Sequence, residues 1–175
     1  VIAADRNHGL AQSIIRGVTR VFTEHDRAIV LEDDLVTAPD FLVFMNACLD
    51  YYEPLADVGS VTGYSPLNRL PDDYASSVYL LPRSCSLGWG TWRNRWRRVD
   101  WEVREFAKIR DSFLDRLRFD ACGSDRYYRL RRQIERGIDS WSIRFGYWQH
   151  RQGMNTVYSF PSRILNIGDD GSGVH

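Results

Sequence analysis

One stretch of this chain constrains its fold more than any other, because it joins an apolar run directly to three acids. The run Ala28–Leu31 is aliphatic and partly β-branched, which is typical of a buried strand in a largely parallel sheet. Glu32, Asp33 and Asp34 follow it at once. Carboxylates at the end of a buried strand are costly without a compensating cation, and open α/β sheets bind ligands at this end of their strands.

The acidic triplet offers only oxygen ligands, which suit a hard divalent cation such as Mn²⁺ or Mg²⁺. If the strand continues through the acids, Glu32 and Asp34 point to one face and Asp33 to the other. The other interpretation is a solvated turn in which one acid stabilises the N-terminus of the next helix. For that helix the sequence predicts Thr37 as the N-cap and Pro39 in the first turn.

Composition narrows the class of protein. The chain has 175 residues, 43% hydrophobic and 26% charged, enough for one globular domain. Its formal net charge of +0 gives no electrostatic support for coating a nucleic acid, so we expect no nucleic-acid partner. No apolar run approaches the ~18 residues of a membrane span. Three widely spaced cysteines form no metal or disulfide pattern, which favours a reducing compartment.

The hydrophobic pattern alternates between strand-like and helix-like segments, as in an α/β layer. Expected strands lie at 1–4, 28–31, 58–64 and 78–81. Expected helices lie at 10–22, 41–52 and 140–150, and the charged region 100–136 is helical in pattern with a break at 122–124. The arginines of that region alternate with acids, so we interpret it as a solvated helix face rather than a nucleic-acid helix.

Two aromatic segments and the last residue are further candidates. Trp89 lies between Gly88 and Gly90, which indicates a close backbone approach and favours a binding wall over a core position. Asp139 is either a general base or a helix N-cap, and the residues alone favour the cap. His175 is either a metal ligand or an exposed terminal side chain.

Taken in order, several motifs resemble those of glycosyltransferases with the GT-A fold. They are VLEDDLVTAPDFL, GY, SLGWGTW, IDSWSIR and PSRILNIGDDGSGVH, and the resemblance extends from Asn7 to the end of the chain. The series is most similar to the family of N-acetylglucosaminyltransferase I and its bacterial relatives, often grouped with family 2 glycosyltransferases. The resemblance implies an α/β fold with a mixed sheet flanked by helices, and a single glycosyltransferase domain over residues 1–175.

The resemblance also implies roles for individual residues. Asp34 matches the direct ligand of a Mn²⁺ (or Mg²⁺) that bridges the donor's diphosphate, and the tail makes His175 a candidate for a metal or diphosphate contact. Asp139 matches the base that deprotonates the acceptor hydroxyl. The remaining matches are substrate-binding: Glu32 and Asp33 at the donor's ribose and sugar, Gly88 and Trp89 beside the donor sugar and acceptor, and Gly63, Tyr64 and Trp141 in the flanking motifs.

The implied activity is metal-dependent transfer of a hexose or N-acetylhexosamine from a nucleotide-sugar, expected to be a UDP-sugar, to a hydroxyl of a glycan or lipid-linked acceptor. One base and no nucleophile predict inversion at the anomeric carbon. The expected setting is the bacterial cytoplasm, peripheral to the inner membrane, in polysaccharide synthesis. Relatives carry a first strand and helix that recognise uridine, so we expect this chain to be the C-terminal portion of the domain and weak or inactive alone.

The sequence departs from the family pattern at two positions, and two other functions remain as alternatives. Ala11 and Gln12 stand where the eukaryotic enzyme has larger side chains, which leaves the donor's identity open. A non-catalytic carbohydrate-binding module would use the aromatic residues of 89–101 as a sugar platform. A nucleotidyltransferase would also place acids at a strand end, but it would carry a Gly-rich, basic phosphate loop near its start, which this sequence lacks.

Overall fold

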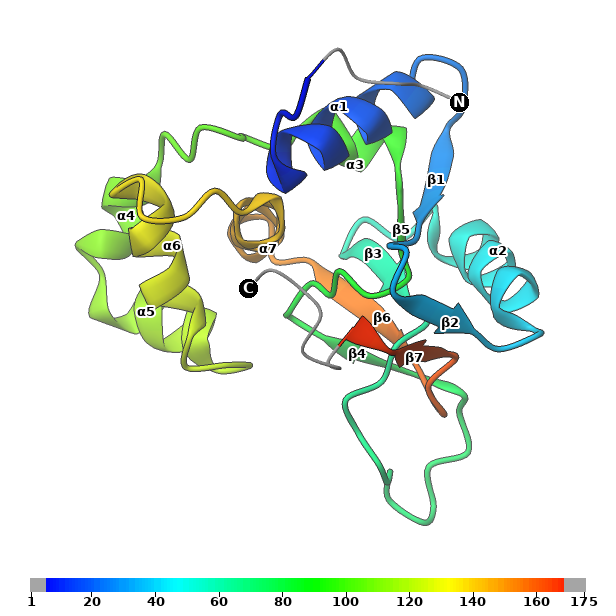
Figure 1. Ribbon diagram of the computed structural model, residues 1–175. Coiled ribbons are helices and arrows are strands. Elements are labelled where there is room, and N and C mark those ends of the chain that lie inside the picture. Colours follow the sequence, from blue (N-terminus) through cyan, green and yellow to red (C-terminus); the bar gives the residue numbers. More distant parts are fainter. Residues whose placement is uncertain (1–5, 169–175) are drawn as a thin grey trace.

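A mixed five-stranded sheet organises the computed structural model of this chain, which describes residues 6–168 (Figure 1). The strand order is β1-β5-β3-β6-β4, and β2 and β7 form a separate two-stranded ribbon. The strands are β1 (Arg27–Val30), β2 (Leu35–Thr37), β3 (Val58–Thr62), β4 (Val78–Leu81), β5 (Trp89–Trp92), β6 (Asn155–Ser159) and β7 (Ile164–Asn166). The predicted α/β class, a mixed sheet flanked by helices, is confirmed; the strand expected at 1–4 lies outside the described residues.

The expectation of a largely parallel sheet is wrong. Only β3 and β6 pair in parallel, and β1 pairs antiparallel with β5, its one partner among residues 6–168. The error has a physical reason: Ala28 and Val30 pack on one face of the sheet and Ile29 on the other. An apolar run indicates that both faces of a strand are packed against other elements, but it does not indicate whether the strand is parallel or antiparallel to its neighbours.

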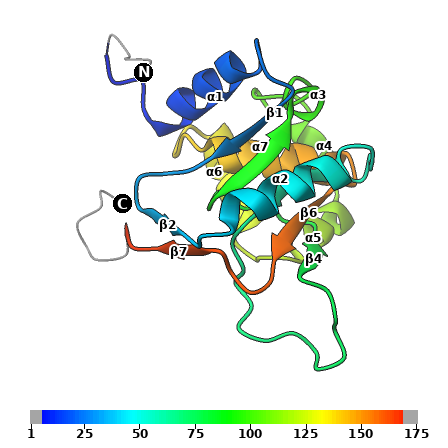
Figure 2. The same cartoon turned by 90° about the vertical axis from the view of Figure 1, so that its right-hand side faces the viewer.

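Helices cover both faces of the sheet. Figures 1 and 2 show α2 on one face and α1 with α7 on the other, while α4, α5 and α6 lie outside α7. The helices are α1 (Leu10–Val21), α2 (Phe41–Tyr52), α3 (Arg93–Trp96), α4 (Phe106–Arg110), α5 (Phe113–Asp120), α6 (Arg126–Ile134) and α7 (Trp141–Arg151). Within residues 6–168, none of these helices is long and apolar enough to cross a membrane.

The start of α2 differs from the prediction. Thr37 is not the N-cap, because it belongs to β2 and pairs with Ile164 of β7. Asp40 precedes the helix, and its carboxylate accepts a hydrogen bond from Arg163 Nε at 2.9 Å. The helix then buries Phe41 and Met45 against the sheet. Long-range pairing of the β2–β7 ribbon therefore overrides the local capping signal.

The end of α7 is held by a partly buried histidine, which predicts how stability depends on pH. His150 Nε2 lies 2.9 Å from Asp115 Oδ1 and packs on Phe119, with 5.0 Å between ring centroids. Burial lowers the pKa of His150 below its ordinary 6.5, although Asp115 opposes this. The unfolded chain therefore takes up this proton first, and the free energy of unfolding is expected to fall as the pH falls through 6.5.

The test is a series of urea unfolding curves between about pH 5 and 8 for the wild type and His150→Gln. The variant keeps a polar group beside Asp115 but cannot titrate in this range, so its stability should depend less steeply on pH. Equal pH slopes for the two proteins would show that His150 does not contribute.

Candidate functional site

Strand register gathers most of the predicted site residues at one edge of the sheet. The last residues of β1 and β3, Val30 and Thr62, both pair with Trp89, the first residue of β5. Whatever follows β1 and β3, or precedes β5, therefore lies at that edge (Figure 1). The predicted residues in these positions are Glu32, Asp33, Asp34, Gly63, Tyr64 and Gly88.

The three acids form a turn rather than a strand extension. Strand β1 ends at Val30, and the backbone N–H of Leu35 donates to the carbonyl of Glu32 at 3.3 Å. Because β1 ends before the acids, the alternation of faces expected for a continued strand does not apply; Glu32 and Asp34 are half-buried and Asp33 is exposed. Burial raises the pKa of Glu32, and the negative charges of Asp34 and Asp33 raise it further. A cation at this turn would relieve that crowding of charge.

Asp34 is the acid best placed to bind a cation. Among the described residues its Oδ1 is buried and has no hydrogen-bond partner. The N–H of Ile167 donates to the Asp34 carbonyl at 3.0 Å, and a side chain on Gly168 would begin 2.5 Å from Oδ2. A buried carboxylate oxygen without a partner fits a hard cation. No group of three His, Cys, Asp or Glu side chains able to hold a metal occurs within residues 6–168, and His175 lies outside that range.

The two glycines of the edge allow close packing. The N–H of Gly63 donates to the carbonyl of Gly88 at 2.8 Å. A Cβ on Gly63 would lie 2.5 Å from the Phe41 ring, and one on Gly88 would lie 2.5 Å from Cδ1 of Ile164. The close approach predicted from the glycines flanking Trp89 is thus, at Gly88, an approach to Ile164 of β7.

The predicted binding wall at Trp89 needs correction. Its side chain is 0% exposed and stacks on Trp141, itself buried, with 4.7 Å between ring centroids. Phe145 and Trp96 complete the same cluster. Because β5 is flanked on both sides and faces α7, the ring has no open surface for a sugar. Trp89 and Trp141 are therefore core residues in this structure, and of the predicted substrate-binding aromatics only Tyr64 lines a cavity.

Asp139 is exposed just before α7, and a buried arginine fixes its position. Arg144 Nη2 donates to Asp139 Oδ1 at 2.7 Å, and the same guanidinium donates to the carbonyls of Ser140 and Trp101. The helix N-cap is Ser140, whose hydroxyl accepts from the N–H of Ile143 at 3.5 Å. The interpretation of Asp139 as the helix N-cap is therefore wrong, because the cap is the next residue. The carboxylate of Asp139 is exposed and so is accessible to a proton donor.

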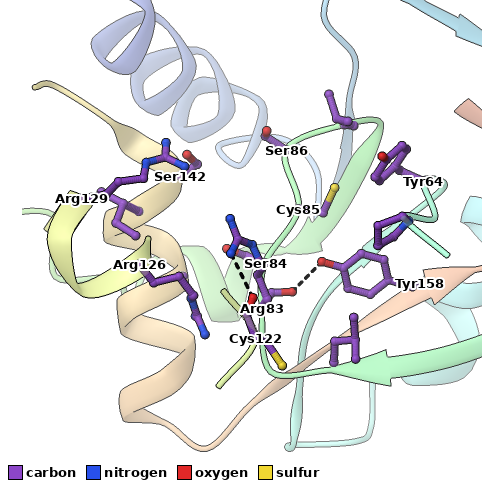
Figure 3. A pocket seen from close by; sticks show the side chains of 15 residues that line it. Tyr64, Arg83, Ser84, Cys85, Ser86, Cys122, Arg126, Arg129, Ser142 and Tyr158 are labelled. Carbon is purple, nitrogen blue, oxygen red and sulfur yellow. Dashed lines mark hydrogen bonds between the residues drawn. The ribbon is translucent and has the colours of Figure 1, made fainter. Parts of the chain in front are cut away.

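Sequence reasoning missed a cavity of about 560 Å³ beside this edge (Figure 3). Its polar walls come from α6, α7, β6 and three loops, which follow β3, precede β5 and join α5 to α6. The polar residues are Tyr64, Arg83, Ser84, Cys85, Ser86, Cys122, Arg126, Arg129, Ser142 and Tyr158. Burial raises the pKa of Cys85, and the charge of Glu32 adds to this effect. The cavity adjoins the sheet edge, because Tyr64 and Leu87 in its wall are the chain neighbours of Gly63 and Gly88. The i, i+3 spacing of Arg126 and Arg129 was the available signal for it.

Comparison with known proteins gives no family: no protein-family model matches the chain, and no curated protein matches it. Its function is therefore inferred from its own residues, their geometry and their charges. The three parts that carry this inference are the acidic turn, the Asp139–Arg144 pair and the arginine-lined cavity.

Gly88 gives a test of the site's packing. Its φ of 54° lies in the left-handed region, and a Cβ would collide with Ile164. Gly88→Ala should therefore be less stable than the wild type because of backbone strain and, in addition, about 1–3 kcal/mol of crowding.

The matched control is Gly153→Ala. Gly153 has a φ of 65° and nothing within 4 Å of the position that an added methyl group would take, so it shares the strain without the collision. Chemical denaturation of both variants measures the difference. Equal losses would show that Ile164 does not pack against Gly88 as described.

Proposed function

We propose that this chain is part of a metal-dependent glycosyltransferase with the GT-A fold, which transfers a sugar from a nucleotide-sugar, a UDP-sugar, to an acceptor hydroxyl. The observation that carries the proposal is the buried Asp34 Oδ1, which among residues 6–168 has no hydrogen-bond partner. It lies in an acidic turn at the sheet edge where β1 and β3 end. The resemblance of the acidic motif to that of GT-A enzymes gives this oxygen a role.

Asp34 would hold the Mn²⁺ or Mg²⁺. Its buried carboxylate oxygen, which has no partner among the described residues, would anchor the ion, and the oxygens of the donor's diphosphate are ligands of the kind that such an ion takes. When bound, the ion supplies charge neutralisation for the departing nucleoside diphosphate. Glu32, half-buried beside Asp34, and the exposed Asp33 are then available for the donor's sugar and ribose.

Asp139 would accept the proton of the attacking hydroxyl. Its exposure lets an acceptor approach, and Arg144 fixes one carboxylate oxygen while the other stays available. Arg144 is itself buried and held by two backbone carbonyls, so it orients the base without leaving its place. A single base without a protein nucleophile implies an inverting reaction. The anomeric configuration of the product, read by NMR, decides this point.

The acceptor is proposed to be a glycan or a lipid-linked sugar in a bacterial cytoplasm, with the protein peripheral to the inner membrane. Three free cysteines, Cys48, Cys85 and Cys122, support a reducing compartment. The non-catalytic carbohydrate-binding alternative loses most of its support, because three of the four tryptophans of its sugar platform, Trp89, Trp92 and Trp96, are at most 2% exposed, and only Trp101 is partly buried.

Asp34→Asn tests the metal site. The substitution keeps the size of the side chain and leaves the backbone carbonyl that accepts from Ile167, but removes the charge that a divalent cation needs. Calorimetric titration of UDP should show binding in Mn²⁺ that chelator abolishes, and the variant should bind no better in Mn²⁺ than the wild type in chelator.

The control for this titration is Asp73→Asn, which removes the charge of an exposed carboxylate in the loop between β3 and β4. It should bind UDP like the wild type. Metal-independent UDP binding, or full binding by Asp34→Asn, would overturn the assignment of Asp34.

Asp139→Asn tests the base. The amide oxygen still accepts from Arg144, so the local structure should persist while proton transfer is lost. Sugar transfer should slow by about 10²–10⁴-fold, the usual contribution of a general base. UDP binding should stay unchanged, because this substitution does not alter the acidic turn. Near-normal turnover would remove Asp139 from the role.

A further inference from the structure

The cavity beside the sheet edge carries an excess of positive charge. Three arginines line it, Arg83, Arg126 and Arg129, and none of its described lining residues is acidic. The nearest paired carboxylate is that of Asp125, which lies 2.9 Å from Arg83 and 3.6 Å from Arg129. Three guanidinium groups against one carboxylate leave two positive charges in excess. Such a cavity favours an anion over a neutral group.

Arg126 is the strongest sign of a ligand. It is 3% exposed, its Nη1 donates to the carbonyl of Phe119 at 2.6 Å, and its guanidinium lies 4.1 Å from the centroid of the Phe119 ring. Its Nη2 is buried and has no hydrogen-bond partner among the described residues. Burial lowers the pKa of Arg126 to about 10, and the charge of Arg83 contributes. A buried charged donor without an acceptor is costly, so a bound acceptor would stabilise it.

The surroundings of this donor fit an oxygen-rich group. Ser84, Ser86 and Ser142 line the same cavity with hydroxyls (Figure 3). Gly146 of α7 makes room for Ser84, because a Cβ there would lie 2.6 Å from Ser84 Oγ and in ordinary contact, at 3.8 Å, with Arg126 Nη2. The absent side chain therefore lets a hydroxyl and a guanidinium share one wall. Guanidinium and hydroxyl donors together are suited to a phosphate or carboxylate.

We infer that this cavity binds an oxyanion, a phosphate or carboxylate group, carried by the acceptor glycan. The donor's diphosphate is assigned to the acidic turn, whereas Ser142 follows the proposed base Asp139 by three residues at the start of α7. An acidic sugar held at Arg126 would thus lie against the start of α7, the helix that Asp139 precedes, although Asp139 itself lines a separate pocket with Gln133 and Ile138. The acceptor assignment rests on the proposed glycosyl transfer; the oxyanion site itself stands on the cavity alone.

The experiment measures binding of glucose 6-phosphate, glucuronate and neutral glucose by calorimetry, in chelator and without donor. Wild type should bind at least one of the two anionic sugars and should bind glucose at least about tenfold more weakly, the scale of one charge-assisted hydrogen bond. Arg126→Gln can still donate to Phe119 but lacks the charge, and should weaken anion binding by about tenfold or more.

Two further variants keep the test decisive if Arg126→Gln folds poorly. Arg129→Gln removes a second, half-buried lining charge and should also weaken anion binding. Arg131→Gln removes an exposed charge of the same helix that does not line the cavity, and it should bind like the wild type. Asp34→Asn should also bind the anionic sugar normally, which separates this site from the metal site.

The remaining outcomes overturn either the oxyanion site or its assignment to the acceptor. No binding of either anionic sugar, or binding that Arg126→Gln and Arg129→Gln leave unchanged, would overturn the oxyanion site. If Arg126→Gln instead weakens UDP binding in Mn²⁺ as strongly as it weakens sugar phosphate binding, the cavity belongs to the donor's diphosphate, and the acceptor assignment is wrong. Anion binding by a chain with no UDP binding would leave the site standing while the proposed glycosyl transfer fails.

Discussion

The packing of Trp89 against α7 is the contact on which the rest of the site depends. The residue is aligned with the last residues of two strands and stacks on Trp141, whose backbone begins α7. One buried ring therefore sets the sheet edge, the start of the helix and the position of Asp139, two residues before Trp141. Aromatic stacking of this kind is fully buried and close-packed, so the elements that carry the polar residues cannot slide past one another.

Much of the fold was predictable because burial of one face of an element imposes a period on its sequence. The predicted helices at 10–22, 41–52 and 140–150 correspond to α1, α2 and α7 with ends shifted by no more than two residues. The break predicted at 122–124 separates α5 from α6. Strand direction and the cap of α2 were not predictable, since both depend on pairing with β5 and β7, which lie far away in the sequence.

The candidate site was predictable in part, for a related reason. A motif identifies the kinds of atoms present, and the acids and glycines of the edge do lie where the strand ends converge. It does not say whether a side chain is exposed. Trp89 is therefore predicted to line a binding site, whereas its side chain is fully buried. The same limit applied to Arg126, which in the sequence resembles the other arginines of a solvated helix but is 3% exposed and faces a cavity.

The two charged regions of the site complement each other. In the acidic turn, burial and then the charges of Asp34 and Asp33 raise the pKa of Glu32; in the cavity, burial and then the charge of Arg83 lower the pKa of Arg126. Each of the two regions contains a buried polar atom that has no partner among the described residues, Asp34 Oδ1 in one and Arg126 Nη2 in the other. A bound cation would satisfy the first and a bound anion the second. In the proposed enzyme a metal ion at the acidic turn would hold the donor's diphosphate and the arginines would hold the acceptor's oxyanion, so that the two substrates would occupy separate places, as transfer between them requires.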